Sequence, residues 1–173
     1  MDLKKIIRNV PNFPQDGVQF KDITTLIKNR DAFKESIDWM CSKYKDEKVD
    51  KVLAVESRGF IFGAPVALQL NAGLILIRKE GKLPADSLRV KYELEYGEDI
   101  LEMHRDALDP KDNVIIVDDL LATGGTTEAT IKLVEQVPAN ILGLCFLIEL
   151  EGINGRSRLE PYRVDSLIKY PDE

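Results

Sequence analysis

The sequence is poor in the residues and patterns that mark several large classes of protein. Its 173 residues include only two cysteines, Cys41 and Cys145, and a single histidine, His104. Both cysteines lie within apolar patterns, which favours buried thiols over a disulfide or a metal site. A reducing cytoplasm is the simplest setting for such thiols. His104 follows a predicted hairpin, and we interpret it as structural.

Long apolar stretches and an excess of positive charge are also missing. No segment has the length and apolarity of a membrane span, and residues 1–8 lack the apolar core of a signal peptide. The net charge of -6 argues against non-specific binding to nucleic acid or anionic membranes. A hydrophobic content of 44% and a charged content of 31% are typical of a soluble globular protein, and this length suits one domain over 1–173.

Residues 113–127 form the stretch around which the chain is organised. The β-branched run 114–117 predicts a strand buried on both faces of a parallel sheet. Asp118 and Asp119 follow this run, and a Gly/Thr-rich turn at 123–127 leads into a helical pattern. This turn matches neither a Walker loop, because no Gly-Lys-Ser/Thr follows, nor the Gly-x-Gly-x-x-Gly fingerprint.

The chemistry of this stretch suits a phosphorylated sugar. Gly124 and Gly125 allow positive φ, so that successive N–H groups can face one concavity at a helix N-terminus, which attracts an anion. Asp118 and Asp119 can accept hydrogen bonds from sugar hydroxyls or from metal-bound water. A phosphate at one end and a diol at the other describe a 5-phosphorylated ribose. The alternative is an ordinary strand–helix turn with a Thr N-cap and solvent-exposed acids.

Further apolar runs predict the rest of an α/β fold. Strands are expected near 51–56, 73–77, 114–117, 139–149 and 164–168, with helices near 2–9, 31–45 and 60–70 and after the central turn. Alternation of strands and helices implies a parallel β-sheet flanked by helices on both faces. Residues 10–17 are expected to be an irregular loop and 90–103 a hairpin. Polar turns follow the carboxyl ends of the strands, where they can converge on one crevice.

The central stretch closely resembles the phosphoribosyl pyrophosphate (PRPP) signature of type I phosphoribosyltransferases. Its form, Val-Asp-Asp-Leu-Leu-Ala-Thr-Gly-Gly-Thr, is similar to the version in the adenine phosphoribosyltransferases. Four other segments, beginning at Phe13, Glu56, Ile77 and Leu94, resemble that family's hood, pyrophosphate loop, basic loop and lid. The resemblance runs from about residue 12 to residue 150.

The resemblance implies a role for each matching residue. Implied for the 5-phosphate are Ala122, Thr123, Gly124, Gly125 and Thr126. Implied for pyrophosphate are Arg58, Arg78, Lys79 and Lys82. Implied for adenine are Gln19, Phe20, Lys21 and Leu150, with Phe20 stacking on the base. Implied for catalysis are Glu95, Asp118, Asp119 and Arg58. It also implies a hood at about 1–25, a flexible hairpin lid at about 83–103, and a cis peptide bond between Glu56 and Ser57.

The implied reaction converts adenine and PRPP into AMP and pyrophosphate. Mg²⁺ is the implied cofactor, carried mainly by PRPP, so we expect no dedicated metal ligands. A homodimer is implied as well. Three alternatives stay open: transfer to hypoxanthine, guanine, xanthine or uracil; a PRPP-sensing regulator without catalysis; and a bare nucleotide-binding module. The hood residues disfavour the first, and the acidic charge disfavours a regulator that binds nucleic acid.

Overall fold

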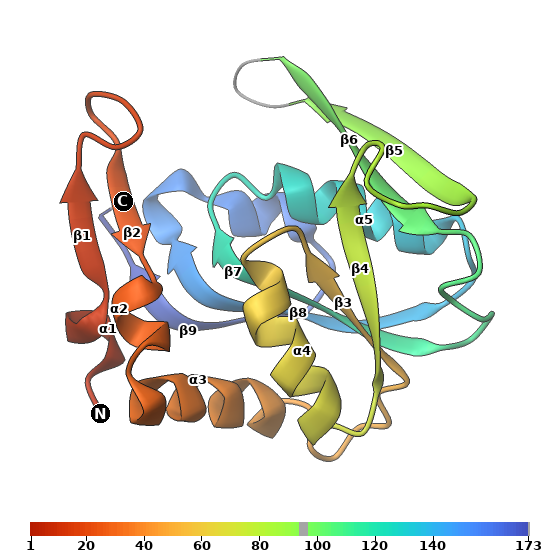
Figure 1. Cartoon of the computed structure of the whole chain (residues 1–173), viewed down its shortest axis with the longest axis horizontal. Coiled ribbons are helices and arrows are strands. Elements are labelled where there is room, and N and C mark those ends of the chain that lie inside the picture. The colour runs from red at the N-terminus through yellow and green to blue at the C-terminus, as the bar shows by residue number, and fades with distance from the viewer. Residues whose placement is uncertain (94–96, 173) are drawn as a thin grey trace. The chain divides into compact units, whose positions relative to one another are not determined.

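A computed structural model of the chain describes residues 1–93 and 97–172 (Figure 1). Contacts divide it into two compact units, residues 1–39 and residues 40–173. No helix within the described ranges is long and apolar enough to cross a bilayer. Cys41 and Cys145 are buried free thiols, as predicted.

The first unit contains short helices and a two-stranded antiparallel sheet. Its elements are α1 (Leu3–Ile6), β1 (Arg8–Pro11), β2 (Gln19–Asp22), α2 (Thr24–Ile27) and most of α3 (Arg30–Ser42). Val10 pairs with Phe20 across the sheet. The prediction of an irregular loop over 10–17 is therefore wrong for Val10 and Pro11, which belong to β1. Pro11 is tolerated there because it ends an edge strand, where a missing N–H breaks no ladder.

The second unit is built on a seven-stranded sheet with the order β5-β6-β4-β3-β7-β8-β9. The strands are β3 (Lys51–Val55), β4 (Gly73–Lys79), β5 (Ser87–Glu93), β6 (Glu98–His104), β7 (Asn113–Leu121), β8 (Asn140–Leu150) and β9 (Val164–Tyr170). Five of them, β4, β3, β7, β8 and β9, run parallel. The predicted hairpin, β5 and β6, joins the sheet antiparallel to β4 at Arg78 and Lys79.

Helices α4 (Gly59–Gln69) and α5 (Gly125–Glu135) lie on opposite faces of this sheet (Figure 1). Alternate side chains of a strand point to opposite faces. On β3, Leu53 belongs to the same buried cluster as Leu133 of α5. The next residue, Ala54, faces α4, where a Cβ added to Gly63 would lie 2.4 Å from the Ala54 Cβ. The predicted parallel sheet with helices on both faces is confirmed.

Strand β7 is longer than its apolar run. The sequence places Asp118 and Asp119 after the strand, but β7 continues through them to Leu121. Pairing with β8 extends this far, with Asp118 opposite Phe146 and Leu121 opposite Glu149. Backbone hydrogen bonds hold the strand where its side chains are no longer uniformly apolar. The acid pair is therefore fixed on the sheet itself.

Candidate active site

A pocket of about 250 Å³ lies at the carboxyl ends of β3 and β7. These strands are parallel neighbours, so the turns that follow them meet at one edge of the sheet. The pocket is lined by Glu56, Ser57, Arg58, Asp118, Asp119, Leu120, Leu121, Ala122, Thr123, Gly124, Gly125, Thr126 and Thr127. The structure thus brings together two segments, 56–58 and 118–127, that lie far apart in the sequence.

Two adjacent carboxyl groups form the acidic part of the pocket. Asp119 is buried, and its Oδ2 lies 2.9 Å from Nε of Arg58. The Asp118 Oδ1 atom accepts the backbone N–H of Asp119 at 2.8 Å. Burial raises the pKa of Asp118 well above its ordinary value, and the neighbouring Asp119 carboxylate raises it further. Burial also raises the pKa of Asp119, although Arg58 opposes this shift.

The first residue of α4 lets this helix begin directly against the acid pair. A Cβ on Gly59 would lie 2.9 Å from Oδ1 of Asp118 and 3.0 Å from the carbonyl oxygen of Val117. Only glycine leaves room for that approach. It places Arg58, the residue before the helix, beside Asp119. The preceding peptide bond between Glu56 and Ser57 is cis, as the resemblance implied.

The turn after β7 is open to an anion. Gly124 precedes α5 with a left-handed φ of 80°, and within the described part of the chain no side chain caps the helix. The alternative of a Thr-capped turn is therefore wrong. The first residues of α5, Gly125 to Thr127, line the pocket, where the N–H groups and dipole of a helix N-terminus favour negative charge. This arrangement suits a phosphate at residues 122–126.

A second glycine, Gly155, packs against the phosphate loop, which we define as residues 122–126. The 3₁₀ helices η1 (Glu151–Ile153) and η2 (Gly155–Leu159) follow β8. A Cβ on Gly155 would lie 1.9 Å from the carbonyl oxygen of Ala122, and one on Gly124 would lie 2.8 Å from the carbonyl oxygen of Gly155. The two backbones are in direct contact. Sequence reasoning missed Gly155, whose only signal was a glycine in an irregular loop.

Of the predicted basic residues, Arg58 lines the pocket, whereas Arg78, Lys79 and Lys82 do not. Glu56 Oε2 accepts the Lys79 backbone N–H at 2.9 Å and Nε of Arg78 at 3.2 Å. Burial opposes ionisation of Glu56, but these two donors outweigh it and lower its pKa. The Lys79 ammonium pairs with Asp99 of β6 at 3.0 Å, and Lys82 is exposed. Glu56, which the sequence reasoning gave no binding role, thus ties the end of β4 to the pocket.

The three predicted adenine residues of the first unit are neighbours on β2. Gln19 is exposed, and its Oε1 accepts a hydrogen bond from Asn9 at 2.7 Å. The Phe20 ring is half-buried and meets Phe13 edge-on, with centroids 5.1 Å apart. Lys21 is buried, and its Nζ donates to Asn9 Oδ1 at 2.9 Å. These contacts fix three side chains of β2, and their role toward a base stays a prediction.

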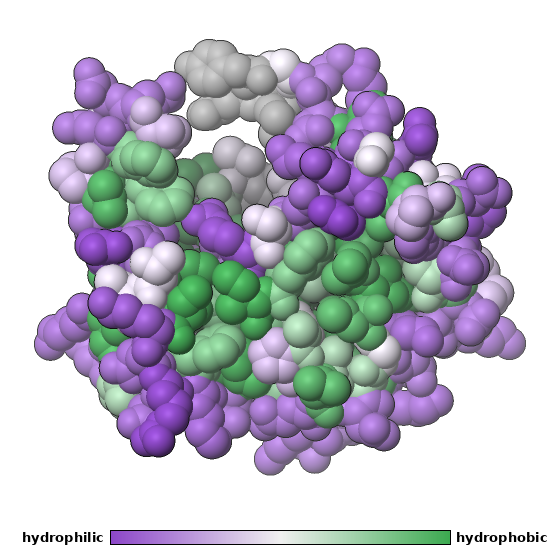
Figure 2. Space-filling model, viewed as in Figure 1, coloured by the Kyte–Doolittle hydropathy of each residue, from purple (hydrophilic) through white to green (hydrophobic). Residues whose placement is uncertain are grey.

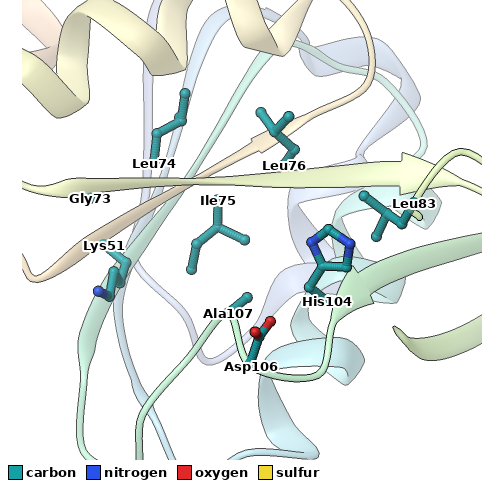
Figure 3. Close-up of a pocket in the computed structure, with 9 residues that line it drawn as sticks. All are labelled: Lys51, Gly73, Leu74, Ile75, Leu76, Leu83, His104, Asp106 and Ala107. Atoms are coloured by element: carbon teal, nitrogen blue, oxygen red, sulfur yellow. The ribbon is translucent and has the colours of Figure 1, made fainter. Parts of the chain in front are cut away.

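Two further residues, Leu150 and His104, lie outside this pocket. Leu150 ends β8, immediately before η1, and does not line the pocket. Glu95 lies outside the described residues. His104 lines a second pocket of about 270 Å³ beside β4, together with Leu74, Leu76 and others (Figure 3). Its Nε2 is buried and has no hydrogen-bond partner among the described residues.

Comparison with known proteins identifies the class. The phosphoribosyl transferase domain family matches residues 22–171, and the chain belongs to this family. An adenine phosphoribosyltransferase of Caldicellulosiruptor saccharolyticus is 53% identical over 170 residues, covering 98% of this chain and 97% of the relative. Within the family, the chain therefore belongs to the adenine phosphoribosyltransferases.

Solved structures agree with this assignment. The adenine phosphoribosyltransferase of Thermoanaerobacter pseudethanolicus superposes with a TM-score of 0.95 at 47% identity, covering 98% of both chains. The enzyme of Saccharomyces cerevisiae, complexed with D-2,5-dideoxy-2,5-imino-altritol 1,6-bisphosphate and adenine, gives a TM-score of 0.91 at 40% identity and covers 96% of both chains. The fold predicted from the sequence is that of these proteins.

Proposed function

We propose that this chain transfers the 5-phosphoribosyl group of PRPP to adenine, giving AMP and pyrophosphate in purine salvage. One observation carries the proposal: the acid pair and the uncapped phosphate loop share one pocket. The 53% identity to an adenine phosphoribosyltransferase supports it, and so does the adenine complex of the yeast enzyme.

Asp118 and Asp119 are proposed to act on the ribose. Bond breaking at the anomeric carbon places positive charge on the ring, as in glycoside hydrolysis. The two carboxylates would hold the ribose hydroxyls and place negative potential beside the developing cation. The Arg58 guanidinium opposes the rise in the Asp119 pKa and has further N–H groups for the leaving pyrophosphate.

The two phosphate ends of PRPP are assigned to different parts of the site. Residues 122–126 would hold the 5-phosphate through the N–H groups at the start of α5. Arg78, Lys79 and Lys82, beside Arg58, would neutralise the pyrophosphate. Glu56 supports this assignment because it binds both Arg78 and the backbone of Lys79 at the pocket's edge.

Magnesium is proposed to arrive with PRPP. Within residues 1–93 and 97–172, no group of three or more His, Cys, Asp or Glu side chains could hold a metal ion. The acid pair supplies carboxylates that could contact metal-bound water, which fits an ion that retains much of its hydration. When bound, Mg²⁺ would neutralise charge on the pyrophosphate.

Base recognition is assigned to Gln19, Phe20 and Lys21 of the hood and to Leu150 after β8. Phe20 offers an aromatic face for stacking. The lid, residues 83–103, is proposed to exclude water, which would otherwise hydrolyse PRPP. Glu95 at its tip is proposed to manage the proton on the attacking ring nitrogen. If Glu95→Ala leaves turnover unchanged, this residue has no part in the reaction.

A homodimer in the cytoplasm is the proposed form of the protein. Leu68, Leu74 and Leu76 are 84%, 41% and 38% exposed. Figure 2 shows hydrophobic side chains gathered over α4 and β4, the elements that carry them. An exposed apolar patch of this kind favours a protein partner. The two buried free thiols suit a reducing compartment.

A base-competition assay tests the proposed function. The protein is mixed with PRPP, Mg²⁺ and equal amounts of adenine, hypoxanthine, guanine, xanthine and uracil, and the nucleotides are separated. AMP as the main product supports the proposal. Another nucleotide as the main product would reassign the base, and PRPP binding without any product would favour a sensor.

A further inference from the structure

We propose that Arg158 of η2 is a 5-phosphate-binding residue, which exchanges its ion pair with Glu128 for the phosphate when PRPP binds. The inference rests on the proposed function, because it concerns the 5-phosphate of the same substrate. It assigns a cation to a loop, residues 122–126, that contains no Lys or Arg of its own.

The contact between η2 and the phosphate loop places Arg158. In a 3₁₀ helix, residues three apart lie one above the other. Gly155, which packs on Ala122, and Arg158 therefore lie on the same side of η2. Leu159, the next residue, is 1% exposed within the core and anchors the helix. The blue coil of residues 151–159 runs beside the turn that leads into α5 (Figure 1).

The guanidinium of Arg158 reaches the first residue of α5. A Cβ on Gly125 would lie 3.2 Å from its Nη1, so this nitrogen is close to the backbone at the start of α5. Gly125 lines both the pocket of the acid pair and a neighbouring pocket of about 360 Å³ that contains Arg158. An anion at Gly125 is thus within reach of Arg158.

Charge at the site favours such a contact. A phosphate dianion bound at residues 122–126 shares its pocket with Asp118 and Asp119, both of which repel it. The helix dipole offsets only part of this repulsion. Arginine adds a planar set of donors that matches phosphate oxygens.

A shared carboxylate lets Arg158 move at little cost. Glu128 Oε2 lies 3.2 Å from Arg158 Nε, and its Oε1 lies 2.8 Å from Lys132 Nζ. If Arg158 turns to the phosphate, Lys132 still balances Glu128. The Arg158 side chain is 48% exposed, so this rotation meets no packed core.

The test compares Arg158→Ala with Lys132→Ala. Lys132 is the other cation that pairs with Glu128, and it lies one helical turn further from the phosphate loop. Calorimetry measures Kd for ribose 5-phosphate and for pyrophosphate, and kinetics give kcat and the KM for PRPP. Arg158→Ala should weaken ribose 5-phosphate binding and raise the KM for PRPP about tenfold. Its kcat and pyrophosphate Kd should stay within about twofold of the parent values.

Controls separate this role from a structural one. Arg158→Lys should recover part of the lost affinity. Lys132→Ala should cause a smaller loss than Arg158→Ala, because it leaves Glu128 with one cation fewer but keeps the contact between Arg158 and the phosphate. Equal affinity for ribose 5-phosphate in Arg158→Ala and parent, or an equal loss in Lys132→Ala, overturns the inference. If Arg158→Ala does not fold, Arg158→Gln is used and the same criteria apply. A parent protein that neither binds ribose 5-phosphate nor makes AMP refutes the proposed function instead.

Discussion

Asp118 and Asp119 place two carboxyl groups side by side at the end of β7, and this has a cost in stability. Burial raises the pKa of both groups. A carboxyl whose pKa is higher in the folded than in the unfolded state binds its proton more tightly when folded. The contribution of this pair to the free energy of unfolding is therefore greatest at acidic pH and is lost as the pH rises through the raised pKa values.

Asp118→Asn should stabilise the ligand-free protein while reducing catalysis. The amide keeps an oxygen for the Asp119 N–H but removes one of two like charges. We expect the unfolding midpoint at pH 7 to rise by about 2 to 4 °C, as about 1 kcal/mol would produce at this size, and the gain to shrink toward pH 4. Turnover should fall at least about tenfold.

Thermal unfolding at both pH values and an AMP assay check this. Asp46→Asn, at an exposed carboxylate in a turn, serves as the control. A midpoint for Asp118→Asn that is equal to or below that of the parent would contradict the pKa direction.

Single residues also show where sequence reasoning succeeds. The positions of Arg58 and the phosphate loop follow from local pattern, because each belongs to a turn after a recognisable strand, and Asp118 follows from the apolar run that precedes it within β7. Glu56 and Gly155 do not. Their roles depend on contacts with the end of β4 and with the phosphate loop, and no local rule places those segments together.

Among the structural elements, the η1–η2 segment supports the phosphate loop through the contact of Gly155. Gly155→Ala places a methyl group where the Ala122 carbonyl oxygen lies, and backbone on both sides leaves little room to relax. We expect the KM for PRPP to rise at least about tenfold and the free energy of unfolding to fall by about 1 to 3 kcal/mol. Steady-state kinetics and urea unfolding measure both.

Gly73→Ala is the matched control, because the one tight contact of its Cβ would be with the flexible Lys51 side chain, at 3.0 Å, and the nearest backbone atom would be at an ordinary 3.7 Å. If Gly155→Ala keeps its PRPP KM within about twofold of the parent value, the contact with the loop has no role in binding.

The two-stranded sheet of the first unit gives the opposite pH dependence. Hydrogen bonds from Thr24 and the adjacent Arg8 lower the pKa of Asp22 to about 2. This stability is present above the ordinary pKa near 4 and is lost as the pH falls toward about 2. Asp22→Asn should therefore destabilise the protein at pH 7 and have little effect near pH 2.

Urea unfolding followed by the fluorescence of the single tryptophan, Trp39, measures this difference. Asp16→Asn, at an exposed carboxylate of the same unit, is the comparison. A loss of stability that is equal at pH 7 and pH 2 would mean that ionisation of Asp22 is not its cause.

Apolar patterns predicted the parallel strands and the helices between them, because these elements bury their side chains. They failed where a strand is defined by backbone hydrogen bonds to its neighbour and not by a buried face. β1 carries mostly exposed side chains, β2 has one buried side chain, that of Lys21, and the last residues of β7 alternate between half-buried and buried positions. Pattern reasoning detects burial, and hydrogen-bonded backbone without a uniform buried face escapes it.

For the molecule as a whole, the apolar patch on α4 and β4 predicts self-association. Leu74→Asp introduces a charge that a buried interface would have to desolvate. Multi-angle light scattering should give about twice the chain mass for the parent and about the chain mass for this variant. Ile153→Asp, an exposed apolar position on η1, should stay dimeric. A monomeric parent would refute the dimer, and a dimeric Leu74→Asp variant would place the interface elsewhere.

The contact between Gly124 and Gly155 bears on how the protein is made. A ribosome delivers residues 122–126 before residue 155, so a nascent chain carries the whole phosphate loop before its support exists. Chains released prematurely between these points would have the phosphate loop but not the backbone that packs against it.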